Sequence, residues 1–246
     1  MKKNRTIYFN ISLIKNLKYF FKPSNYYLLF KYFELKYNYK KLIDLEVFMK
    51  VKEKIEYIKK NNLQSKIGRK PIIFVDQDDV CNNFIEQVII EFNERKGTNY
   101  TEDNVTDWDI GACLKAGNAD IFNDMSMFSR LKVREGCYEN FKLLYESGLF
   151  EMYMLSAAHP YAMPYKFDWL IRELPFFDTR RYLTGMNKGL YYGDILLDDG
   201  LHNIEAFKHG EPVIFSRPHN RKYDGPEKRV ETWEEFANYI LDKFYM

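Results

Sequence analysis

The stretch PIIFVDQDDVCNNF, residues 71–84, sets a cluster of negative charge directly behind an apolar run. Residues 72–75 are β-branched or aromatic, and a short run of this kind predicts a buried strand. Asp76, Asp78 and Asp79 follow it at once. Like charges at one point repel one another, and burial favours their neutral forms unless a counter-charge lies close by. The stretch therefore predicts a strand that carries charged groups to one defined place.

The pattern of strand and helix signals continues from this stretch to the C-terminus. Further short apolar runs predict strands at residues 152–155, 182–184, 195–197 and 213–215. Between them apolar residues recur at helical spacing, with stop signals at Gly97 and Gly148 and a capping box formed by Thr232 and Glu235. Strands that alternate with helices predict an α/β fold, a Rossmann-like parallel sheet with helices on both faces.

The residues behind each predicted strand are the candidate site, because ligands of parallel sheets bind beyond the carboxyl ends of the strands. They are Asp76, Asp78 and Asp79 after the first strand, Ser156 after the second, Lys188 after the third, Asp198 and Asp199 after the fourth, and SRPHN, residues 216–220, after the fifth. Carboxylates gathered at one edge favour a hard divalent cation, and Mg²⁺ suits carboxylates that share it with a phosphate. A lysine can neutralise a phosphoryl oxygen, so the set indicates phosphoryl chemistry. The sequence has no GxxxxGK[ST] loop, which excludes a P-loop nucleotidase at the level of motifs.

These motifs, in this order, resemble those of the haloacid dehalogenase superfamily. DQDDV is similar to the first motif, DxDx[TV], Ser156 to the second, Lys188 to the third and GDILLDD to the acidic fourth. A narrower resemblance, over residues 71–246, is to the 5′(3′)-deoxyribonucleotidase family. It is carried by YLTGMNKG, DILLDD, KFDWL and FSRPHN.

The resemblance implies a Mg²⁺-dependent phosphatase that acts on (deoxy)ribonucleoside monophosphates through a phospho-aspartyl intermediate. Asp76 would be the nucleophile, and Asp78 would act first as general acid and then as general base. Ser156 and Lys188 would bind and stabilise the phosphoryl group. The expected metal ligands are Asp76, the backbone carbonyl of Asp78, Asp199 and the neighbouring Asp198.

The resemblance also implies a small helical cap inserted after the first strand, at about residues 85–130. Trp108, Phe122 and Phe128 are candidates to stack on a base, with ordinary cap–core packing as the alternative. Arg217 and His219 would contact phosphate or shape their loop. Asp79 and Ala157 stand where the family most often has a small residue and a second hydroxyl residue, so neither has an assigned role.

The charge of the chain divides it unequally. Residues 1–70 hold 18 Lys and Arg against 5 Asp and Glu, a balance of +13, and residues 71–246 hold 19 against 30, a balance of −11. We therefore predict a basic, aromatic-rich helical extension over residues 1–70 and a catalytic domain over residues 71–246. The opening MKVKEKIEYIKK makes Met49 an alternative start of the protein.

Composition narrows the remaining classes. The three cysteines form no CxxC pair and the four histidines show no metal-ligand spacing, which argues against a disulfide framework and a zinc site. No apolar run reaches the ~20 residues of a membrane span. We expect a cytoplasmic enzyme without a nucleic-acid partner, and a homodimer stays open. The alternatives are a phosphatase for a sugar phosphate or other small metabolite, and a catalytically silent protein that binds through its basic N-terminal region.

Overall fold

The computed structural model of the chain describes residues 51–117, 121 and 124–246. The predictions for the N-terminal extension up to residue 50, for the start at Met49 and for Phe122 lie outside the described residues. Residues 51–246 form one compact unit, and the description below is of that unit.

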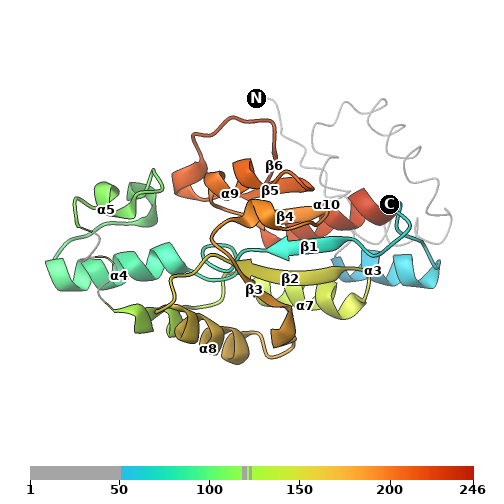
Figure 1. Cartoon of the computed structure of the whole chain (residues 1–246), viewed down its shortest axis with the longest axis horizontal. Helices are drawn as coiled ribbons and strands as arrows, with labels where there is room; N and C mark the ends of the chain where they lie inside the picture. Colours follow the sequence, from blue (N-terminus) through green and yellow to red (C-terminus); the bar gives the residue numbers. More distant parts are fainter. Residues whose placement is uncertain (1–50, 118–120, 122–123) are drawn as a thin grey trace, which may run out of the picture. The chain divides into compact units, whose positions relative to one another are not determined.

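The described residues contain one parallel sheet in the order β3-β2-β1-β4-β5-β6 (Figure 1). Its strands are β1 (Ile72–Val75), β2 (Glu151–Ser156), β3 (Tyr182–Thr184), β4 (Ile195–Asp198), β5 (Glu211–Phe215) and β6 (Lys228–Val230). The α/β prediction is confirmed, and each of the five predicted strands forms. The sixth strand, β6, was missed because its sequence, KRV, offers one apolar residue between a charged start and a turn.

Helices connect the strands. The α-helices are α3 (Val51–Lys60), α4 (Phe84–Lys96), α5 (Ile110–Cys113), α7 (Cys137–Ser147), α8 (Met163–Glu173), α9 (Leu201–Ala206) and α10 (Trp233–Tyr245). Short 3₁₀ turns are η3 (Glu102–Asn104), η4 (Met125–Ser129), η5 (Thr179–Arg181), η6 (Lys188–Leu190) and η7 (Pro218–Asn220). Thr232 caps α10 as predicted, because its Oγ1 accepts a hydrogen bond from the Glu235 N–H. The Glu235 carboxylate accepts from the N–H of Glu231 instead of the N–H of Thr232. In the described part of the chain no helix is long and apolar enough to cross a membrane.

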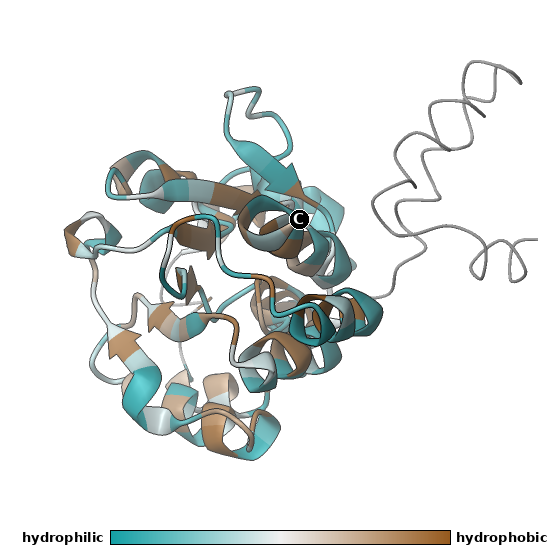
Figure 2. Ribbon diagram, turned by 90° about the vertical axis from the view of Figure 1, so that its right-hand side faces the viewer, coloured by the Kyte–Doolittle hydropathy of each residue, from teal (hydrophilic) through white to brown (hydrophobic). Residues whose placement is uncertain are grey.

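The two faces of the sheet bury different amounts of apolar surface. Successive strand residues point to opposite faces, so Ile73 and Val75 enter the large core while Phe74 between them enters a small cluster with Leu196 and Phe207. Helices α3, α7 and α10 contact one another on the large-core side. Figure 2 shows the hydrophobic stretches concentrated in the strands and on parts of the helices, with hydrophilic loops around them.

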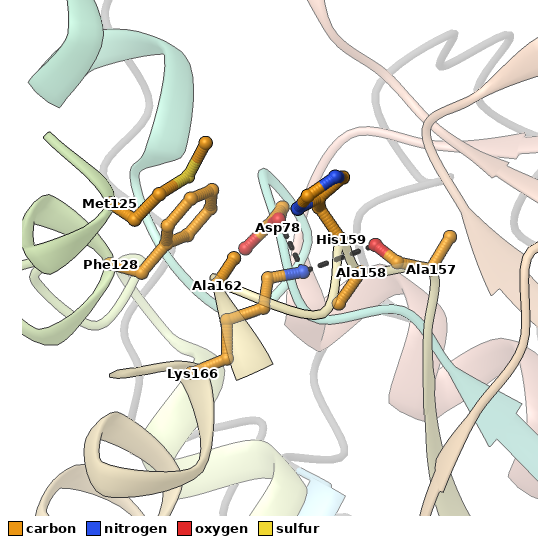
Figure 3. Close-up of a pocket in the computed structure, with 8 residues that line it drawn as sticks. All are labelled: Asp78, Met125, Phe128, Ala157, Ala158, His159, Ala162 and Lys166. Carbon is orange, nitrogen blue, oxygen red and sulfur yellow. Dashed lines mark hydrogen bonds and ion pairs between the residues drawn. The ribbon is translucent and has the colours of Figure 1, made fainter. Parts of the chain in front are cut away.

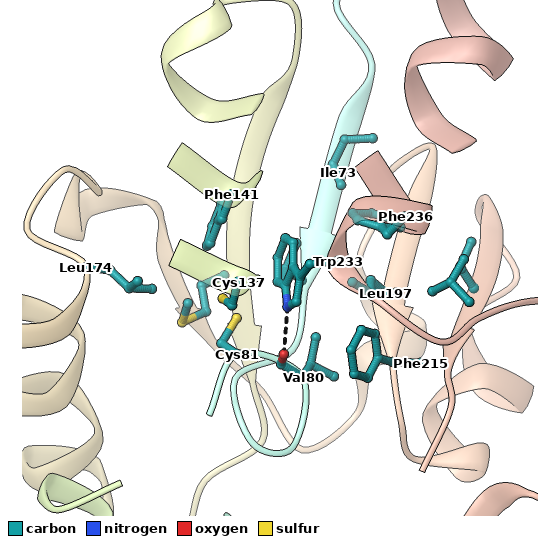
Figure 4. Packing of buried hydrophobic residues seen from close by; sticks show 14 of the residues in the cluster. Ile73, Val80, Cys81, Cys137, Phe141, Leu174, Leu197, Phe215, Trp233 and Phe236 are labelled. Carbon is teal, nitrogen blue, oxygen red and sulfur yellow. Dashed lines mark hydrogen bonds between the residues drawn. The ribbon is translucent and has the colours of Figure 1, made fainter. Parts of the chain in front are cut away.

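Helix α10 is joined to the loop behind β1 by one buried tryptophan. Trp233 is fully buried, and its Nε1 donates a hydrogen bond of 2.8 Å to the Val80 carbonyl (Figure 4). Its ring stacks on Phe141 of α7, with ring centroids 5.4 Å apart. The buried thiol of Cys81 lies in the same region and donates to the carbonyl of Asp76 at 3.2 Å. The last helix of the chain thus supports the loop that carries the first three carboxylates.

Helix α3 belongs to the same compact unit as the sheet. Its Val51, Ile55 and Ile58 are buried in the large core, and Lys54 binds Asp242 of α10 at 2.7 Å. The sequence analysis assigned residues 51–70 to the extension because of their charge. Their apolar residues nevertheless recur at helical spacing, and that face packs on α7 and α10. The predicted division of the chain into an extension over residues 1–70 and a catalytic domain over residues 71–246 stays a prediction.

The segment between β1 and α7 leaves the core and returns to it at one place. Asn82 and Val133 form an isolated β-bridge, and Arg134 donates its backbone N–H to the Cys81 carbonyl at 2.9 Å. Asn83 and Lys132 exchange two further bonds, of 2.7 and 3.1 Å. This base ties down an insertion that holds α4, η3, α5 and η4. Figure 1 shows α4 and α5 on the side of the sheet where the strands end.

Candidate active site

Three carboxylates meet at the carboxyl edge of the sheet. Asp76 follows β1, Asp198 ends β4, the neighbouring strand, and Asp199 follows β4. All three are buried, and each offers a ligand atom within 4.8 Å of the others. Their closeness follows from the pairing of β1 with β4, because neighbouring parallel strands end side by side.

Lys188 is the buried cation of this group. From η6 its Nζ donates to Asp198 Oδ2 at 2.6 Å and to Asp76 Oδ1. Burial raises the pKa of Asp76 to about 8, the charge of Lys188 lowers it, and the neighbouring carboxylates raise it again. Burial lowers the pKa of Lys188, but the charges of Asp198 and Asp76 raise it by more, so it ends above its ordinary value. The lysine therefore stays charged.

A second buried lysine, Lys166 of α8, joins the remaining predicted residues. Its Nζ lies 2.7 Å from Ser156 Oγ and 2.7 Å from Asp78 Oδ2. Gln77, also buried, donates to the Lys166 carbonyl at 3.1 Å and so fixes α8 against the first loop. The other oxygen of Asp78 accepts from Asn82 at 3.1 Å. Ser156 and Asp78 thus face one shared cation.

Lys166 had no predicted role, although it lies in the KFDWL stretch that resembles the family. A signal was present. Lys166 shares helical spacing with Ala162, Trp169 and Leu170, which are all buried, so it lies on the apolar face of α8. A lysine on such a face is a candidate for a buried functional cation.

Asp79 belongs to a different group of charges. Its backbone φ of +54° is left-handed, which is uncommon for a residue other than glycine. Both carboxylate oxygens accept the N–H of Ile85 in the first turn of α4, at 3.1 Å. Arg134 lies 3.1 Å from the carboxylate and Arg217 lies 3.9 Å from it. Burial raises the pKa of Asp79 to about 7, Asp199 raises it further, and the two arginines lower it.

Arg217 and His219, which follow β5, also find partners in the protein. Arg217 binds Glu102 of η3 as well as lying near Asp79. His219 lies against Asp199. Of the two roles that the sequence left open for these residues, the structure supports contacts that shape the loop.

A cavity of about 290 Å³ opens beside Asp78 and Lys166 (Figure 3). Its wall includes Met125 and Phe128 from the insertion and residues 157–159 from the loop after β2. Phe128 stacks on Phe84, with ring centroids 5.3 Å apart, and Lys166 Nζ lies 5.3 Å from the centre of the Phe128 ring. The cavity therefore combines an apolar wall with two charged side chains, Asp78 and Lys166.

Trp108 lies elsewhere. It is 55% exposed, it packs edge-on against His202 and His219, and it does not line this cavity. The structure therefore brings Phe128 to the cavity and places Trp108 on the Asp199 side of the carboxylates.

The carboxylate cluster fits a divalent cation. Asp76, Asp198 and Asp199 supply three negative charges when ionised, and Lys188 supplies one positive charge, which leaves a formal charge of −2. Buried charge of one sign is unfavourable unless a counter-ion compensates it. Oxygen ligands suit Mg²⁺ and Ca²⁺ in preference to softer metals. The arrangement is therefore suited to chemistry on an anionic group.

Comparisons with known proteins agree with this geometry. The family described as 5′ nucleotidase, deoxy (Pyrimidine), cytosolic type C protein matches residues 70–244. A 5′(3′)-deoxyribonucleotidase from Bacillus subtilis is 30% identical over 176 residues, covering 70% of this chain and 99% of that protein. A 5′(3′)-deoxyribonucleotidase from Clostridium acetobutylicum is 28% identical, covering 68% of this chain and 92% of its own.

The similarity of the chain to solved structures is weaker than its similarity to these relatives. The HAD-hydrolase YfnB from Bacillus subtilis, determined with bound magnesium, has a TM-score of 0.48 and 12% identity, and the match covers 71% of this chain and 99% of that one. A HAD family hydrolase from Deinococcus radiodurans has the same TM-score, 0.48, at 11% identity, over 71% of this chain and 96% of that one.

Proposed function

The chain belongs to the 5′ nucleotidase, deoxy (Pyrimidine), cytosolic type C family and is a nucleotidase-like phosphatase, and we propose that it hydrolyses deoxyribonucleoside monophosphates with Mg²⁺ through a phospho-aspartyl intermediate. The observation that carries the proposal is the position of Asp76. It follows the central strand β1, in contact with buried Lys188 and close to the carboxylates of Asp198 and Asp199.

Asp76, Asp199 and the backbone carbonyl of Asp78 would hold the metal. Asp198 is the less available carboxylate, because Lys188 occupies Oδ2 at 2.6 Å and the Gly200 N–H occupies Oδ1 at 2.8 Å. We therefore assign Asp198 mainly to the support of Lys188 and of the loop. A bound divalent cation would supply positive charge to the phosphoryl oxygens and to the nucleophile.

Asp76 would act on phosphorus directly. A carboxylate oxygen of Asp76 forms a bond to phosphorus, and the bond between phosphorus and the nucleoside oxygen breaks. Asp78 gives its proton to that leaving oxygen. In the second half, Asp78 takes a proton from a water that attacks phosphorus, and the bond from phosphorus to Asp76 breaks. Phosphate leaves and both carboxyl groups return to their starting state.

The two lysines would divide the electrostatic work. Lys188 offsets charge on Asp76 and on the phosphoryl oxygens near it, which stabilises the transition state. Lys166 lines the cavity and binds Ser156 Oγ at 2.7 Å, and the two side chains would bind a second phosphoryl oxygen. In the free protein Lys166 also pairs with Asp78 at 2.7 Å.

The cavity beside Asp78 would receive the nucleoside. Phe128 offers its ring as an apolar wall, and its stack on Phe84 fixes the orientation of that ring. We propose that residues 85–130 act as the cap, and that Trp108 bounds the far side of the site instead of contacting the base. A sugar phosphate would leave most of the aromatic wall without a partner, which is why we place it second.

A panel of phosphomonoesters tests the proposal. The full chain is assayed for phosphate release from deoxyribonucleoside and ribonucleoside monophosphates, sugar phosphates and simple aryl phosphates, each with Mg²⁺ and with a chelator. We expect deoxyribonucleotides to give the highest kcat/KM and the chelator to abolish turnover. Preference for sugar phosphates would overturn the substrate assignment but leave the chemistry.

The mechanism has its own test. Asp76→Asn should remove both turnover and the covalent labelling of the protein by a ³²P-labelled substrate after an acid quench. A variant with full activity would overturn the assignment of the nucleophile. Absence of turnover with every ester, combined with salt-sensitive binding through residues 1–70, would favour the silent binding protein instead.

A further inference from the structure

The turn η7 reaches Asp199 with two neighbouring side chains. His219 Nε2 lies 3.1 Å from Asp199 Oδ2 and 3.2 Å from the Asp199 carbonyl oxygen. Asn220 Nδ2 donates to the same carbonyl at 2.9 Å. Both groups that face Nε2 are hydrogen-bond acceptors, so this ring nitrogen carries the proton. The turn therefore holds Asp199 by its side chain and by its backbone.

The His219 ring makes few favourable polar contacts apart from those with Asp199. The side chain is 2% exposed, and within the described ranges its Nδ1 is buried without a hydrogen-bond partner. The Trp108 ring packs edge-on against it, with centroids 5.5 Å apart. A buried polar atom without a partner normally costs stability. Among the described residues, the polar contacts of this ring are with Asp199, at its carbonyl and at its carboxylate. They point to a role at that residue.

The turn is held firmly enough to direct its neighbour. Asn220 Oδ1 accepts from the Arg217 N–H at 3.0 Å and from Arg229 Nη1 at 2.7 Å. Arg229 Nη2 also donates to the Asn220 carbonyl at 3.0 Å. These bonds join η7 to β6, which is the edge strand that the sequence analysis missed. A side chain on a turn fixed in this way can hold a carboxylate in one orientation.

We propose that His219 is a positioning residue for Asp199: its Nε2–H fixes one carboxylate oxygen so that the other is presented to the divalent cation. Asn220 fixes the backbone of the same residue. The inference rests on the metal site of the proposed function. Groups of this kind, which hold a metal ligand without touching the metal, contribute about 10- to 100-fold to metal affinity.

The two carboxylates of β4 are then held by different means. The protein occupies both oxygens of Asp198, with Lys188 on one and Gly200 and Asn203 on the other. The Asp199 carboxylate is instead approached at one oxygen by His219 Nε2, at 3.1 Å. This contrast explains why Asp199, and not Asp198, would be the metal ligand of the pair.

The test measures metal binding directly on the full-length chain. Calorimetric titration with Mn²⁺ and Mg²⁺, without substrate, compares the wild type with H219F, H219L and H219Q. Phenylalanine and leucine remove the donor, whereas the Gln side-chain N–H can reach the place of Nε2–H. R221Q is the matched control, since Arg221 adjoins the same turn but pairs with exposed Asp103. Metal-free melting temperatures report folding.

We expect 10- to 100-fold weaker metal binding for H219F and H219L, recovery in H219Q, and no change in R221Q. With substrate, the Mg²⁺ concentration for half-maximal rate should rise by a similar factor while KM at saturating Mg²⁺ stays near the wild-type value. Wild-type affinity in both apolar variants would overturn the inference. So would a wild type that binds neither metal, or unfolding of both apolar variants, since His219 would then be structural. Because the calorimetry needs no turnover, a failure of the nucleotidase assay alone would leave this result readable.

Discussion

Two clusters of buried and partly buried charged groups lie at the same edge of the sheet, and they differ in the balance of positive and negative charge. The Asp76 cluster holds Asp76, Asp198, Asp199 and Lys188, three carboxylates against one cation. The Asp79 cluster holds Asp79, Glu102, Arg134 and Arg217, two carboxylates against two cations. Both begin in the same loop, and Asp76 and Asp79 are three positions apart.

This difference in charge balance distinguishes a candidate binding site from a group of ion pairs that holds the structure together. The Asp79 cluster is closed: its charges pair with one another and tie the start of α4, the turn η3 and the β5 loop together. The Asp76 cluster is open, because its own lysine cannot neutralise three carboxylates. A protein that keeps such an imbalance in its interior is prepared for a cation or an electrophile from outside. Two carboxylates of one loop therefore have different roles: Asp76 belongs to the candidate site, and Asp79 belongs to the structural ion pairs.

The largest expected effect concerns the open cluster. Asp76→Asn keeps the shape of the side chain but removes the nucleophile, so kcat/KM should fall by about 10⁴-fold or more. Folding should be unchanged or slightly favoured, because one of three repelling carboxylates is gone. Rates and thermal melts of the same preparations check both statements. A strongly destabilised variant would mean that the Asp76 cluster is as closed as its neighbour.

The second-largest expected effect is the stabilisation of the fold by added Mg²⁺, which should bind at the Asp76 cluster. At about one hundred times its Kd, Mg²⁺ should stabilise the fold by about 2.7 kcal/mol. The raised pKa of Asp76 gives the sign of the pH dependence: below about 8 a proton must leave before the carboxylate can bind, so the stabilisation should grow from pH 6 to pH 8. Melting curves with and without Mg²⁺ at both pH values measure it. A pH-independent shift would contradict the role of Asp76 as a ligand.

The closed cluster should show the opposite response. Asp79→Asn tolerates the left-handed φ but replaces one carboxylate oxygen by an amide group that cannot accept from Ile85 or Arg134, so the free energy of unfolding should fall by about 1–3 kcal/mol. The Mg²⁺-induced shift in melting temperature should persist. Urea unfolding monitored by tryptophan fluorescence measures the loss. If this variant kept its stability but lost its metal response, the two clusters would be one functional unit.

The smallest effect comes from the two cavities beside the clusters. Phe128→Ala removes the aromatic wall next to the open cluster, and KM for a deoxyribonucleotide should rise about 3- to 10-fold with kcat largely kept. Ile90→Ala is the control, because Ile90 lines the cavity of about 400 Å³ beside the Asp79 cluster. Its kinetics should match the wild type. Equal effects from both variants would show that the cavities do not differ in function.

The gathering of the open cluster could be predicted because its signals are local. Asp76, Lys188, Asp198 and Asp199 each lie at or after the end of a short apolar strand, and the parallel sheet brings strand ends together without further information. Their specific roles came from the family resemblance and not from spacing. The prediction for Trp108 rested on residue type alone, and an exposed ring carries no signal for what it faces.

The closed cluster could not be predicted in this way. The partners of Asp79 lie 55 residues away at Arg134 and further along at Arg217, and nothing local distinguishes a buried arginine from a solvated one. Nothing in the sequence predicts the left-handed backbone at Asp79 either. Lys166 is the intermediate case, since its helical spacing with buried residues was visible but a charged residue is ordinarily read as exposed.

The bond from Trp233 to Val80 has a consequence for how the protein is made. It spans 153 residues and is buried, so the loop that bears Asp76 gains its support from the last helix of the chain. Synthesis proceeds from the N-terminus at about 5–20 residues per second. For several seconds a nascent chain would carry finished strands but an unsupported loop. A chain truncated before α10 should therefore be inactive however much of the sheet it has built.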